Sequence, residues 1–583
     1  MLYYGLTRPD RPFPGLNKRL EIDYDALGRT TALWGPGEPR SGGTPTATVA
    51  YDVSASAAAK TTMRKLLSGT GTSAKYVTSY SYDDGLGRTR ETQVASPAGG
   101  RIVAATVYDG RGLTRAATQP AYNAGAPGSG LLNPVLATLP QWTETLYDTL
   151  QRPTAVIERS LAAELRRTTT AYPGADRVEV TPPVGGKTAT VMDAAGRTVK
   201  TEEWKDTVVH HDTAYGYNVS GQLAKVTDAS GNVRTFTYDW LDRRTATTDP
   251  DAGTSTNGYD AMGRALWGID GNGSKISYSY DDLGRRTAQW VGEVSTGTKA
   301  AEWTYDTLAK GQPTSATRYV GVNAYTDTVT GYDDSYRPTG TKLTIPTAEG
   351  ALAGDYAFTA AYDRAGNPIE QAMPAAGGLA AETLALSYTD LGLPKALTSN
   401  YGGGATYVKD TLYSQTARLS ERHYGANAQV KRSFTWDTVT GWLSRLTTTA
   451  KADTATPQIA QDDQVTYNSA GDITRILDAA SAIPGTTPGQ SECFTYDGLT
   501  RLSAAFTTTA SSCATGPATG GIDPYNHSYT YDAVGNLTNL TDGTATATYT
   551  YPLRARRRCG PTRSPPSPAP AAPTPTATTT PVS

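Results

Sequence analysis

The chain has few of the residues from which metal centres are built. Its 583 residues include 4 His, 3 Cys and 5 Met. No Cys-x-x-Cys pair occurs, which argues against a zinc site. His210 and His211 are adjacent, so on a strand they point to opposite faces, and with Asp212 they do not make a ligand set. We expect no metal and no cofactor.

Long apolar runs and an excess of one charge are also lacking. No stretch of about 18 apolar residues is present, so we expect no membrane span. The 53 basic and 55 acidic residues leave a net charge of −2 and are dispersed, which argues against a nucleic-acid partner. The first residues, Met1 to Gly5, have neither the basic nor the apolar region of a signal peptide. Together with the repeats described below, this suggests a chain that starts within a larger protein.

Catalytic motifs are missing as well. Neither a Gly-x-Ser-x-Gly elbow nor a Gly-x-x-x-x-Gly-Lys-Ser/Thr loop occurs. Many carboxylates are present, but those with a regular spacing are explained by turns. The sequence therefore predicts a protein that is not an enzyme.

What is abundant is tyrosine and glycine. The chain has 36 Tyr against 6 Phe, together with 59 Gly. A phenol ring packs on one side and forms hydrogen bonds at its tip, which suits thin sheets wetted on one face. The chain is too long for one compact core and suits an array. Helical periodicity is rare, and its best example predicts a short helix over Ser56 to Ser68.

A Tyr-Asp-x-x-Gly motif, often followed by Arg, recurs along the chain in roughly seventeen loose copies. From Tyr217 to Tyr280 the spacing is about 21 residues, and elsewhere insertions stretch it. Five clear copies comprise Tyr24, Asp25 and Gly28; Tyr259, Asp260 and Gly263; Tyr280, Asp281 and Gly284; Tyr362, Asp363 and Gly366; and Tyr531, Asp532 and Gly535.

Each copy predicts a β-hairpin. Alternating β-branched and aromatic residues precede the motif, as in Ser277 to Tyr280, and indicate a half-buried strand. The Asp side chain accepts a backbone N–H two residues on, and the Gly supplies the positive φ of a turn with a bulge. A second strand and a second turn follow. Four copies place Asp242, Gln151, Tyr336 and Thr500 where the Gly belongs, and we expect those turns to be wider or strained.

The motif residues have two further interpretations. Packing of one hairpin on the next explains the tyrosines most simply, while a ladder of exposed rings would stack on sugars. The motif aspartates could bind calcium, although their spacing lacks the dense acidic pattern of known calcium loops.

Two cysteines flank the repeat at Tyr496. Cys493 enters its first strand and Cys513 follows its second. A disulfide between them would tie the ends of this hairpin together and indicate an oxidising compartment. The alternative is two unpaired small residues.

Five segments are expected along the chain. They are an entry segment with the first repeat (1–34), irregular repeats with Gly- and Pro-rich insertions (35–189), regular repeats (190–310), irregular repeats (311–551) and an Arg- and Pro-rich tail (552–583). The tail cannot bury a core and is expected to be disordered. Its abrupt onset favours a GC-rich gene read out of frame, or a truncation.

The repeats resemble the YD repeats of the Rhs (rearrangement hot spot) and wall-associated protein family, over about residues 20 to 551. Cys493 to Leu499, followed by Arg501 and Leu502, resembles large actinobacterial members. This resemblance implies an all-β fold in which stacked hairpins form a spiralling sheet, part of a hollow shell. In that family, to which the teneurins are related, the shell encloses a C-terminal toxin and is closed by a core segment, and members are secreted or lie at the cell surface.

The resemblance therefore implies a non-catalytic scaffold that encapsulates and delivers a toxin in bacterial competition. Its partners would be the toxin cargo or the C-terminal core segment, which we do not find after Tyr551. Two alternatives stay open. One is a cell-surface protein that binds cell-wall glycan through exposed aromatic side chains. The other is a β-propeller enzyme, because two units of about 21 residues match a four-stranded blade.

Overall fold

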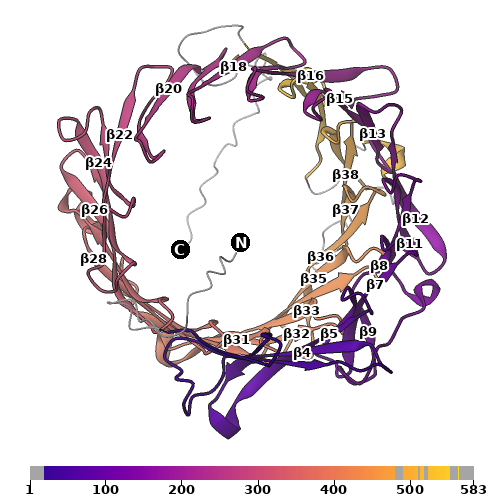
Figure 1. Ribbon diagram of the computed structural model, residues 1–583, viewed down its shortest axis with the longest axis vertical. Coiled ribbons are helices and arrows are strands. Elements are labelled where there is room, and N and C mark those ends of the chain that lie inside the picture. Colours follow the sequence, from indigo (N-terminus) through magenta and orange to yellow (C-terminus); the bar gives the residue numbers. More distant parts are fainter. Residues whose placement is uncertain (1–18, 480–489, 510–511, 518–522, 552–561, 564–583) are drawn as a thin grey trace, which may run out of the picture. The chain divides into compact units, whose positions relative to one another are not determined.

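The computed structural model describes residues 19–479, 490–509, 512–517, 523–551 and 562–563. In these ranges the chain forms β-strands and five short 3-10 helices, and no α-helix (Figure 1). The predicted all-β fold is confirmed. The residues of the expected tail, apart from 562–563, and the first 18 residues lie outside the described ranges, so the expectations for them stay predictions. The 3-10 helices are η1 (Gly71–Ser73), η2 (Leu136–Thr138), η3 (Thr347–Leu352), η4 (Tyr401–Gly403) and η5 (Cys513–Thr515).

The chain divides into two compact units, and the first comprises Met1–Thr169 and Ser255–Asp463. The boundaries fall within or next to β12, β20 and β36. The strands of the first unit are β1 (Glu21–Tyr24), β2 (Thr30–Trp34), β3 (Ala47–Asp52), β4 (Ala59–Ser68), β5 (Lys75–Asp83), β6 (Thr89–Ala95), β7 (Arg101–Tyr108), β8 (Thr114–Thr118), β9 (Ala121–Asn123), β10 (Trp142–Tyr147), β11 (Pro153–Ser160), β12 (Ala163–Ala171), β20 (Gly253–Tyr259), β21 (Ala265–Ile269), β22 (Lys275–Tyr280), β23 (Arg286–Val291), β24 (Thr298–Tyr305), β25 (Pro313–Val320), β26 (Asn323–Tyr332), β27 (Pro338–Ile345), β28 (Gly354–Tyr362), β29 (Pro368–Met373), β30 (Glu382–Tyr388), β31 (Pro394–Ser399), β32 (Ala405–Tyr413), β33 (Leu419–Tyr424), β34 (Val430–Trp436), β35 (Leu443–Ala450) and β36 (Gln458–Tyr467).

The second unit comprises Thr170–Thr254 and Gln464–Ser583. Its strands are β13 (Arg177–Thr181), β14 (Thr188–Met192), β15 (Thr198–Trp204), β16 (His210–Tyr217), β17 (Leu223–Thr227), β18 (Val233–Tyr238), β19 (Arg244–Asp249), β37 (Ile473–Asp478), β38 (Gln490–Tyr496), β39 (Leu502–Thr508), β40 (Asn526–Tyr531), β41 (Leu537–Asp542), β42 (Ala545–Thr550) and β43 (Thr562–Arg563).

Strands pair antiparallel in chain order. From β20 to β35 each strand is hydrogen-bonded to the next one, and the labelled members of this series follow one another along the sheet in Figure 1. The strands from β13 to β19 continue in the same way in the second unit. Such an unbroken sheet does not divide into four-stranded blades. The β-propeller alternative is therefore wrong.

Each repeat hairpin carries a bulge at its motif residue. The register shifts between Asp23 and Tyr24, between Ser279 and Tyr280, and between Thr530 and Tyr531. A bulge of this kind goes with a turn whose last residue has positive φ. The predicted hairpin with a bulged turn is confirmed.

The helix predicted over Ser56 to Ser68 is wrong. Residues Ala59–Ser68 form strand β4 instead. One edge of β4 pairs with β3 and its other edge with β5, so both sets of its backbone groups are satisfied by neighbouring strands. Sheet pairing thus overrides a weak helical pattern, which is common because propensity is a weak constraint.

The core is thin, because most strand residues are only half buried. Leu66 and Ile157 are among the few large apolar side chains that lose almost all their exposure. Some polar groups are buried as well: Glu91 is 1% exposed and accepts the N–H groups of Leu132 and Asn133. The sheet thus anchors part of the Pro-rich insertion through one buried carboxylate.

Segments far apart in sequence also meet within each unit. In the first unit Lys75 Nζ donates to Asp390 Oδ1 at 2.8 Å, and Ser96 Oγ donates to the Gln415 carbonyl at 2.7 Å. In the second unit Gly186 N–H donates to the Gly498 carbonyl at 2.6 Å. These contacts join repeats that are some 300 residues apart in the sequence. The sequence of a single repeat does not predict them.

Candidate functional site

The repeated turn is built around its aspartate. In the repeat at Tyr280, Asp281 Oδ1 accepts the N–H groups of Leu283 at 3.1 Å and Arg285 at 2.8 Å. Asp281 Oδ2 accepts Nε–H of Arg285 at 2.7 Å. The same three bonds recur around Asp25 and Asp260, while in the repeats at Asp363 and Asp532 an asparagine side chain replaces the arginine. Because both oxygens are occupied by the protein's own donors, these aspartates do not resemble a calcium-ligand set.

The turn geometry is the same with and without glycine. Gly284 has a φ of 79°, and its N–H donates to the Asp281 carbonyl at 2.9 Å. The four replacements Gln151, Asp242, Tyr336 and Thr500 adopt φ values of 65°, 64°, 60° and 59°. Their N–H groups make the same turn bond, at 2.9 to 3.2 Å. Of the two expected alternatives, wider or strained turns, the second is confirmed, because these residues take up the left-handed conformation and with it a steric cost.

The arginine of each turn also reaches the next repeat. The guanidinium carbon of Arg264 lies 4.9 Å from the ring centre of Tyr280, and that of Arg285 lies 4.4 Å from the ring centre of Tyr305. The same stacking joins Arg88 to Tyr108, Arg337 to Tyr362 and Arg501 to Tyr531. A guanidinium over a phenol ring is a favourable cation–π contact. The arginine therefore connects two consecutive repeats.

The tyrosine hydroxyl completes this connection. Tyr280 Oη donates to the Ala265 carbonyl at 2.7 Å, and Tyr531 Oη donates to the Leu502 carbonyl at 2.8 Å. Tyr362 does the same with Pro338 at 3.1 Å. Tyr24 differs, because it is 57% exposed and its repeat is the first one described. Ring and hydroxyl are thus both used between neighbouring hairpins, as the packing interpretation predicts, and Tyr259 also makes an interaction within the described chain.

Comparison with known proteins agrees with this repeat. The family model described as RHS Repeat matches residues 217–254. The crystal structure of TcdB2-TccC3 has a TM-score of 0.77 at 15% identity, over 92% of this chain and 31% of that chain. The crystal structure of TcdB2-TccC3-Cdc42 has a TM-score of 0.74 at 14% identity, over 91% of this chain and 33% of that one.

This chain contains an RHS repeat. A structure of the Photorhabdus luminescens Tc holotoxin pore is also similar, with a TM-score of 0.69 at 16% identity, over 86% of this chain and 27% of that chain. The Rhs-repeat chain spans about a third or less of the structures that it resembles. No curated protein matches it.

The structure reveals one Rhs repeat that the sequence analysis missed. Tyr413 Oη donates to the Pro394 carbonyl at 2.6 Å, and the Ser414 hydroxyl accepts the N–H groups of Thr416 at 3.3 Å and Arg418 at 3.1 Å. Serine thus takes the place of the turn aspartate. The signal that could have found it is the Tyr-Ser-x-x-x-Arg spacing, since Ser forms the same type of turn more weakly.

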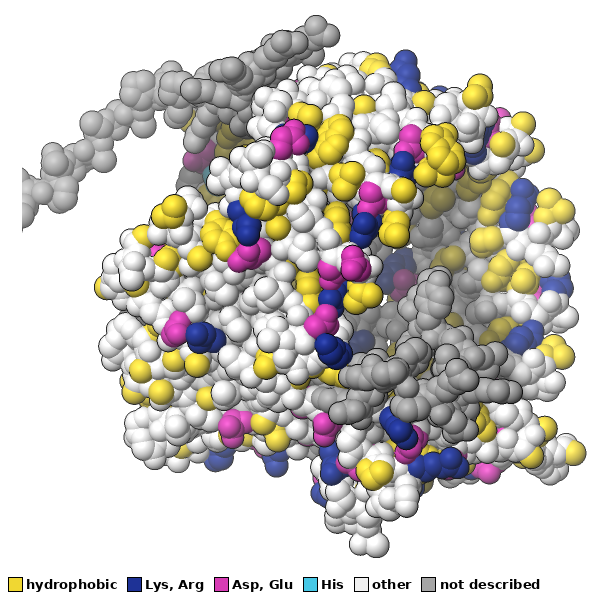
Figure 2. Space-filling model, turned by 60° about the vertical axis from the view of Figure 1, so that its left-hand side comes forward, with side chains coloured by type: hydrophobic (Ala, Val, Ile, Leu, Met, Phe, Trp, Pro, Cys, Tyr) yellow, Lys and Arg dark blue, Asp and Glu magenta, His cyan; other side chains and the backbone are white. Residues whose placement is uncertain are grey.

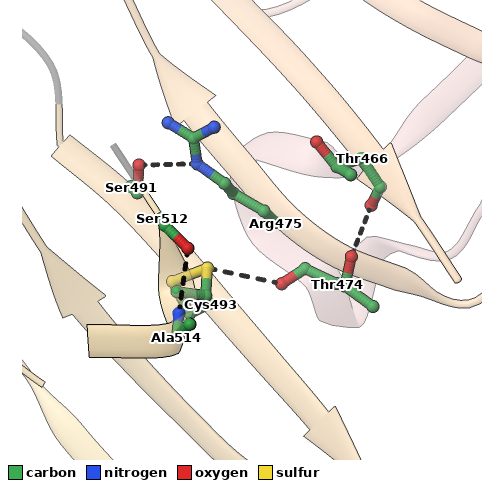
Figure 3. The surroundings of a disulfide bond; sticks show 8 residues. Thr466, Thr474, Arg475, Ser491, Cys493, Ser512 and Ala514 are labelled. Carbon is green, nitrogen blue, oxygen red and sulfur yellow. Dashed lines mark hydrogen bonds between the residues drawn. A yellow bond between two sulfur atoms is a disulfide. The ribbon is translucent and has the colours of Figure 1, made fainter. Parts of the chain in front are cut away.

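Cys493 and Cys513 are joined by a disulfide (Figure 3). Cys493 on β38 is fully buried, and its partner opens η5. The Sγ atom of Cys513 lies 3.8 Å from the Thr474 carbonyl of β37. The bond therefore holds η5 against β38, the first strand of the Tyr496 repeat, and beside β37.

Exposed apolar side chains lie at the tips of the Rhs turns. Two residues after the motif aspartate, Leu27, Met262 and Leu283 are 78%, 81% and 76% exposed. On the face that Figure 2 shows, many acidic and basic side chains lie in pairs and do not gather into a large patch of one charge. The turn tips, and not the motif tyrosines that follow Tyr24, are thus the exposed apolar part of the repeats.

Two cavities lie within the units. One, of about 980 Å³ in the first unit, is lined by Pro134 and Pro140 of the Pro-rich insertion and by Phe434 and Trp436. The other, of about 700 Å³ in the second unit, includes Trp204 and Tyr496. The ring of Trp204 is already covered by Lys187 Nζ at 4.4 Å from its centre and by the ring of His210 at 4.8 Å. That indole is therefore not free to stack on a ligand.

Metal-ligating groups do not gather in the part of the chain that the structure describes, where no set of three or more His, Cys, Asp or Glu is placed to hold an ion. His210 Nδ1 lies 2.7 Å from Asp212 Oδ1. Within the same described ranges, no helix is both long enough and apolar enough to cross a membrane.

Proposed function

We propose that this Rhs-repeat chain is part of the wall of a shell that encloses a toxin polypeptide and delivers it in competition between bacteria. The observation that carries the proposal is the likeness of fold to TcdB2-TccC3 over 92% of this chain. Another of the similar structures is of a Tc holotoxin pore. The resemblance to Rhs proteins implies the enclosed cargo and the delivery.

The chemistry of the repeat supports a structural role. Asp281 uses its carboxylate oxygens on its own turn, while Tyr280 uses its hydroxyl on the preceding strand. Arg285 donates both to Asp281 and to Asp306 of the next repeat. A wall needs groups that hold neighbouring hairpins together and needs no reactive group. We propose that the chain acts sterically, by excluding proteases and solvent from its cargo, and that it is not an enzyme.

The proposal also includes secretion or display at the cell surface, as in the family. The disulfide between Cys493 and Cys513 supports an oxidising compartment, because such bonds persist mainly outside the cytosol. Quantification of free thiols in protein isolated from its native source would check this. A disulfide fully reduced in the native material would contradict it.

Protease protection tests the enclosure. The complete gene product would be treated with a protease, and the survival of the polypeptide that follows the repeats would be followed by mass spectrometry. We expect that polypeptide to survive until denaturant unfolds the repeats. A matched sample of the same polypeptide without the repeats should be cleaved at once. Equal cleavage rates in the two samples would reject the shell.

Glycan binding is the alternative function, and it can be tested with the same purified protein. Trp240, at a turn tip, is 86% exposed and is the most exposed aromatic side chain among the described residues. If the repeats bind glycan, a pulldown with peptidoglycan should retain the protein, and Trp240→Ala should reduce retention. We expect no retention by either protein, because most motif tyrosines are used between strands.

A further inference from the structure

Two arginines face each other across neighbouring strands of the first unit. Arg422 on β33 is the register partner of Arg432 on β34. Register partners in an antiparallel pair project to the same face, with their Cβ atoms about 5 Å apart. Like charges in this arrangement destabilise a sheet. The pair therefore needs a compensating group.

No such group is present in the described part of the chain. The Nε atoms of Arg422 and Arg432 are both buried and have no hydrogen-bond partner there. Neither guanidinium forms an ion pair with a described carboxylate, and the guanidinium of Arg432 lies 5.9 Å from the centre of the Phe434 ring. A buried donor without a partner is costly. Most other arginines of the repeats meet an aspartate or a glutamate.

The other face of the same two strands is balanced. There Glu421 accepts a hydrogen bond from Ser433 Oγ at 3.1 Å, and it pairs with His423 and, at 3.9 Å, with Lys431 Nζ. The basic residues on one face thus form ion pairs with a glutamate of the chain, and the arginines on the other face form none. This contrast between the two faces of one hairpin argues that the negative charge that compensates the arginine pair comes from a ligand.

The register partners of the two arginines on the next strands are threonines. Thr411 on β32, which is 4% exposed, is paired with Arg422, and Thr448 on β35 is paired with Arg432. The nearby carboxylate on this side, Asp463, accepts a hydrogen bond from Gln461 Nε2 at 2.6 Å. Gln461 in turn accepts the Thr448 hydroxyl at 2.9 Å. That acid is held by its neighbour and is not paired with either arginine.

A cavity lies beside the neighbours of the pair. Residues two apart on a strand share a face. Ser420 and Phe434, each two residues from one of the arginines, line the cavity of about 980 Å³. The cavity wall is thus formed in part by the neighbours of the two arginines on the same face of β33 and β34.

We propose that Arg422 and Arg432 form a binding site for a small oxyanion of the phosphate or sulfate class. A dianion neutralises both charges at once, and its oxygens suit the forked donors of two guanidinium groups. The ligand supplies the acceptors that both Nε–H groups lack. This site is independent of the proposed toxin delivery.

Calorimetric titration of the purified protein with inorganic phosphate and with sulfate tests the site. We expect saturable binding at constant ionic strength, and a thermal unfolding midpoint that rises with phosphate but not with matched sodium chloride. Arg422→Gln and Arg432→Gln should each weaken binding about tenfold or more, because a charge-assisted bidentate contact is lost.

The control lies on the same strand. Lys431→Gln removes one positive charge from the opposite face of β34 and should leave phosphate affinity within about twofold. Absence of saturable binding to the unaltered protein would overturn the proposal whatever the variants do. An equal loss in Lys431→Gln would also overturn it, because it would indicate a general effect of charge.

Stability without phosphate gives a second readout. Since the pair is unmatched in the empty site, Arg432→Gln should unfold at the same temperature as the unaltered protein or at a higher one. A clear decrease would mean that this guanidinium already has a partner in the protein, which contradicts the site.

Discussion

A single aspartate organises each turn, because its two oxygens accept hydrogen bonds from two backbone N–H groups and from the side chain four residues on. Hydrogen bonds from the Arg88 side chain and N–H lower the pKa of Asp84 to about 2. In the most buried copy, Asp497, burial raises the pKa but the bonds from Arg501 outweigh it, so the net shift is downward. The ionised carboxylate is thus the form that the fold requires.

Replacing Asp497 by alanine should lower the free energy of unfolding by about 1 to 3 kcal/mol, because the N–H groups of Leu499 and Arg501 lose their acceptor. Urea unfolding would measure the loss. The control is Asp282→Ala, which removes an exposed turn carboxylate and should change stability by less than about 0.5 kcal/mol. Equal losses in the two variants would contradict this role of the aspartate.

The turn position that glycine occupies in most repeats can be tested by substitution in both directions, from glycine and to glycine. Gln151→Gly should stabilise the protein by about 1 kcal/mol, since glycine adopts a φ of 65° without steric cost. Gly28→Gln should destabilise it by a similar amount, because no atom lies within 4 Å of the added Cβ and only the backbone is affected. Thermal unfolding would give both values. Two changes of the same sign would refute the argument.

At the scale of the element, consecutive hairpins are joined by backbone hydrogen bonds and by the Arg–Tyr contact. The sheet is thin and its side chains are only half buried, so apolar burial alone contributes little at each repeat. A one-dimensional array has no shared core, so hydrogen bonds and Arg–Tyr contacts between neighbouring hairpins stabilise it instead.

Removal of one tyrosine hydroxyl tests the link. Tyr280→Phe should cost about 1 kcal/mol, because the Ala265 carbonyl loses its donor while the ring stays in place. Tyr24→Phe is the matched control and should cost almost nothing, since Tyr24 is 57% exposed. Hydrogen exchange of the two hairpins would resolve the effects, and a larger effect at Tyr24 would disprove the assignment.

At the scale of the whole molecule, close backbone contacts join distant repeats inside a unit. A Cβ added at Gly186 would lie 1.6 Å from the Trp204 carbonyl and 3.2 Å from that of Gly498. The first of these contacts lies within the hairpin of β14 and β15, and the second is with a segment about 300 residues away. We expect Gly186→Ala to destabilise the second unit by about 1 to 3 kcal/mol through overpacking.

Gly85→Ala is the control for that substitution, because no atom lies within 4 Å of its added Cβ. Calorimetric unfolding of the two variants would compare them. If Gly186→Ala unfolds like the unaltered protein, the close approach of Gly186 to the carbonyls of Trp204 and Gly498 does not exist in solution.

The change in the free energy of unfolding at acidic pH is also a property of the whole molecule. Hydrogen bonds from Arg88, Arg285 and Arg177 lower the pKa values of Asp84, Asp306 and Glu202 to about 2, from ordinary values of 3.8 and 4.5. A carboxyl whose pKa is lowered by folding stabilises the protein above its unfolded pKa, and this contribution is lost as the pH falls through the folded pKa.

The free energy of unfolding should therefore fall as the pH decreases from about 4.5 to about 2. Urea midpoints measured across this range would show the decrease. Asp84→Asn removes one of the titrating groups and should make the decrease shallower. A midpoint that does not change down to pH 2 would contradict these assignments.

Much of the local architecture could be predicted from the sequence. The strands before Tyr280 and Tyr531, the Asp-centred turns and the left-handed glycines follow from spacing alone, because each depends on residues within one hairpin. The repeat at Tyr413 was missed since a serine replaces its aspartate. The helix expected near Lys65 became a strand because two neighbouring strands satisfy its backbone.

The sequence by itself thus determined the repeat, its turn chemistry and the all-β class, since these rest on interactions over about six residues that recur with a period. Only the tertiary structure decided which arginine covers which tyrosine, why Gly186 must lack a side chain, and that Arg422 faces Arg432. Those relations join residues that are brought together by strand register and by contacts between distant segments. Such contacts leave no periodic signal in a single chain.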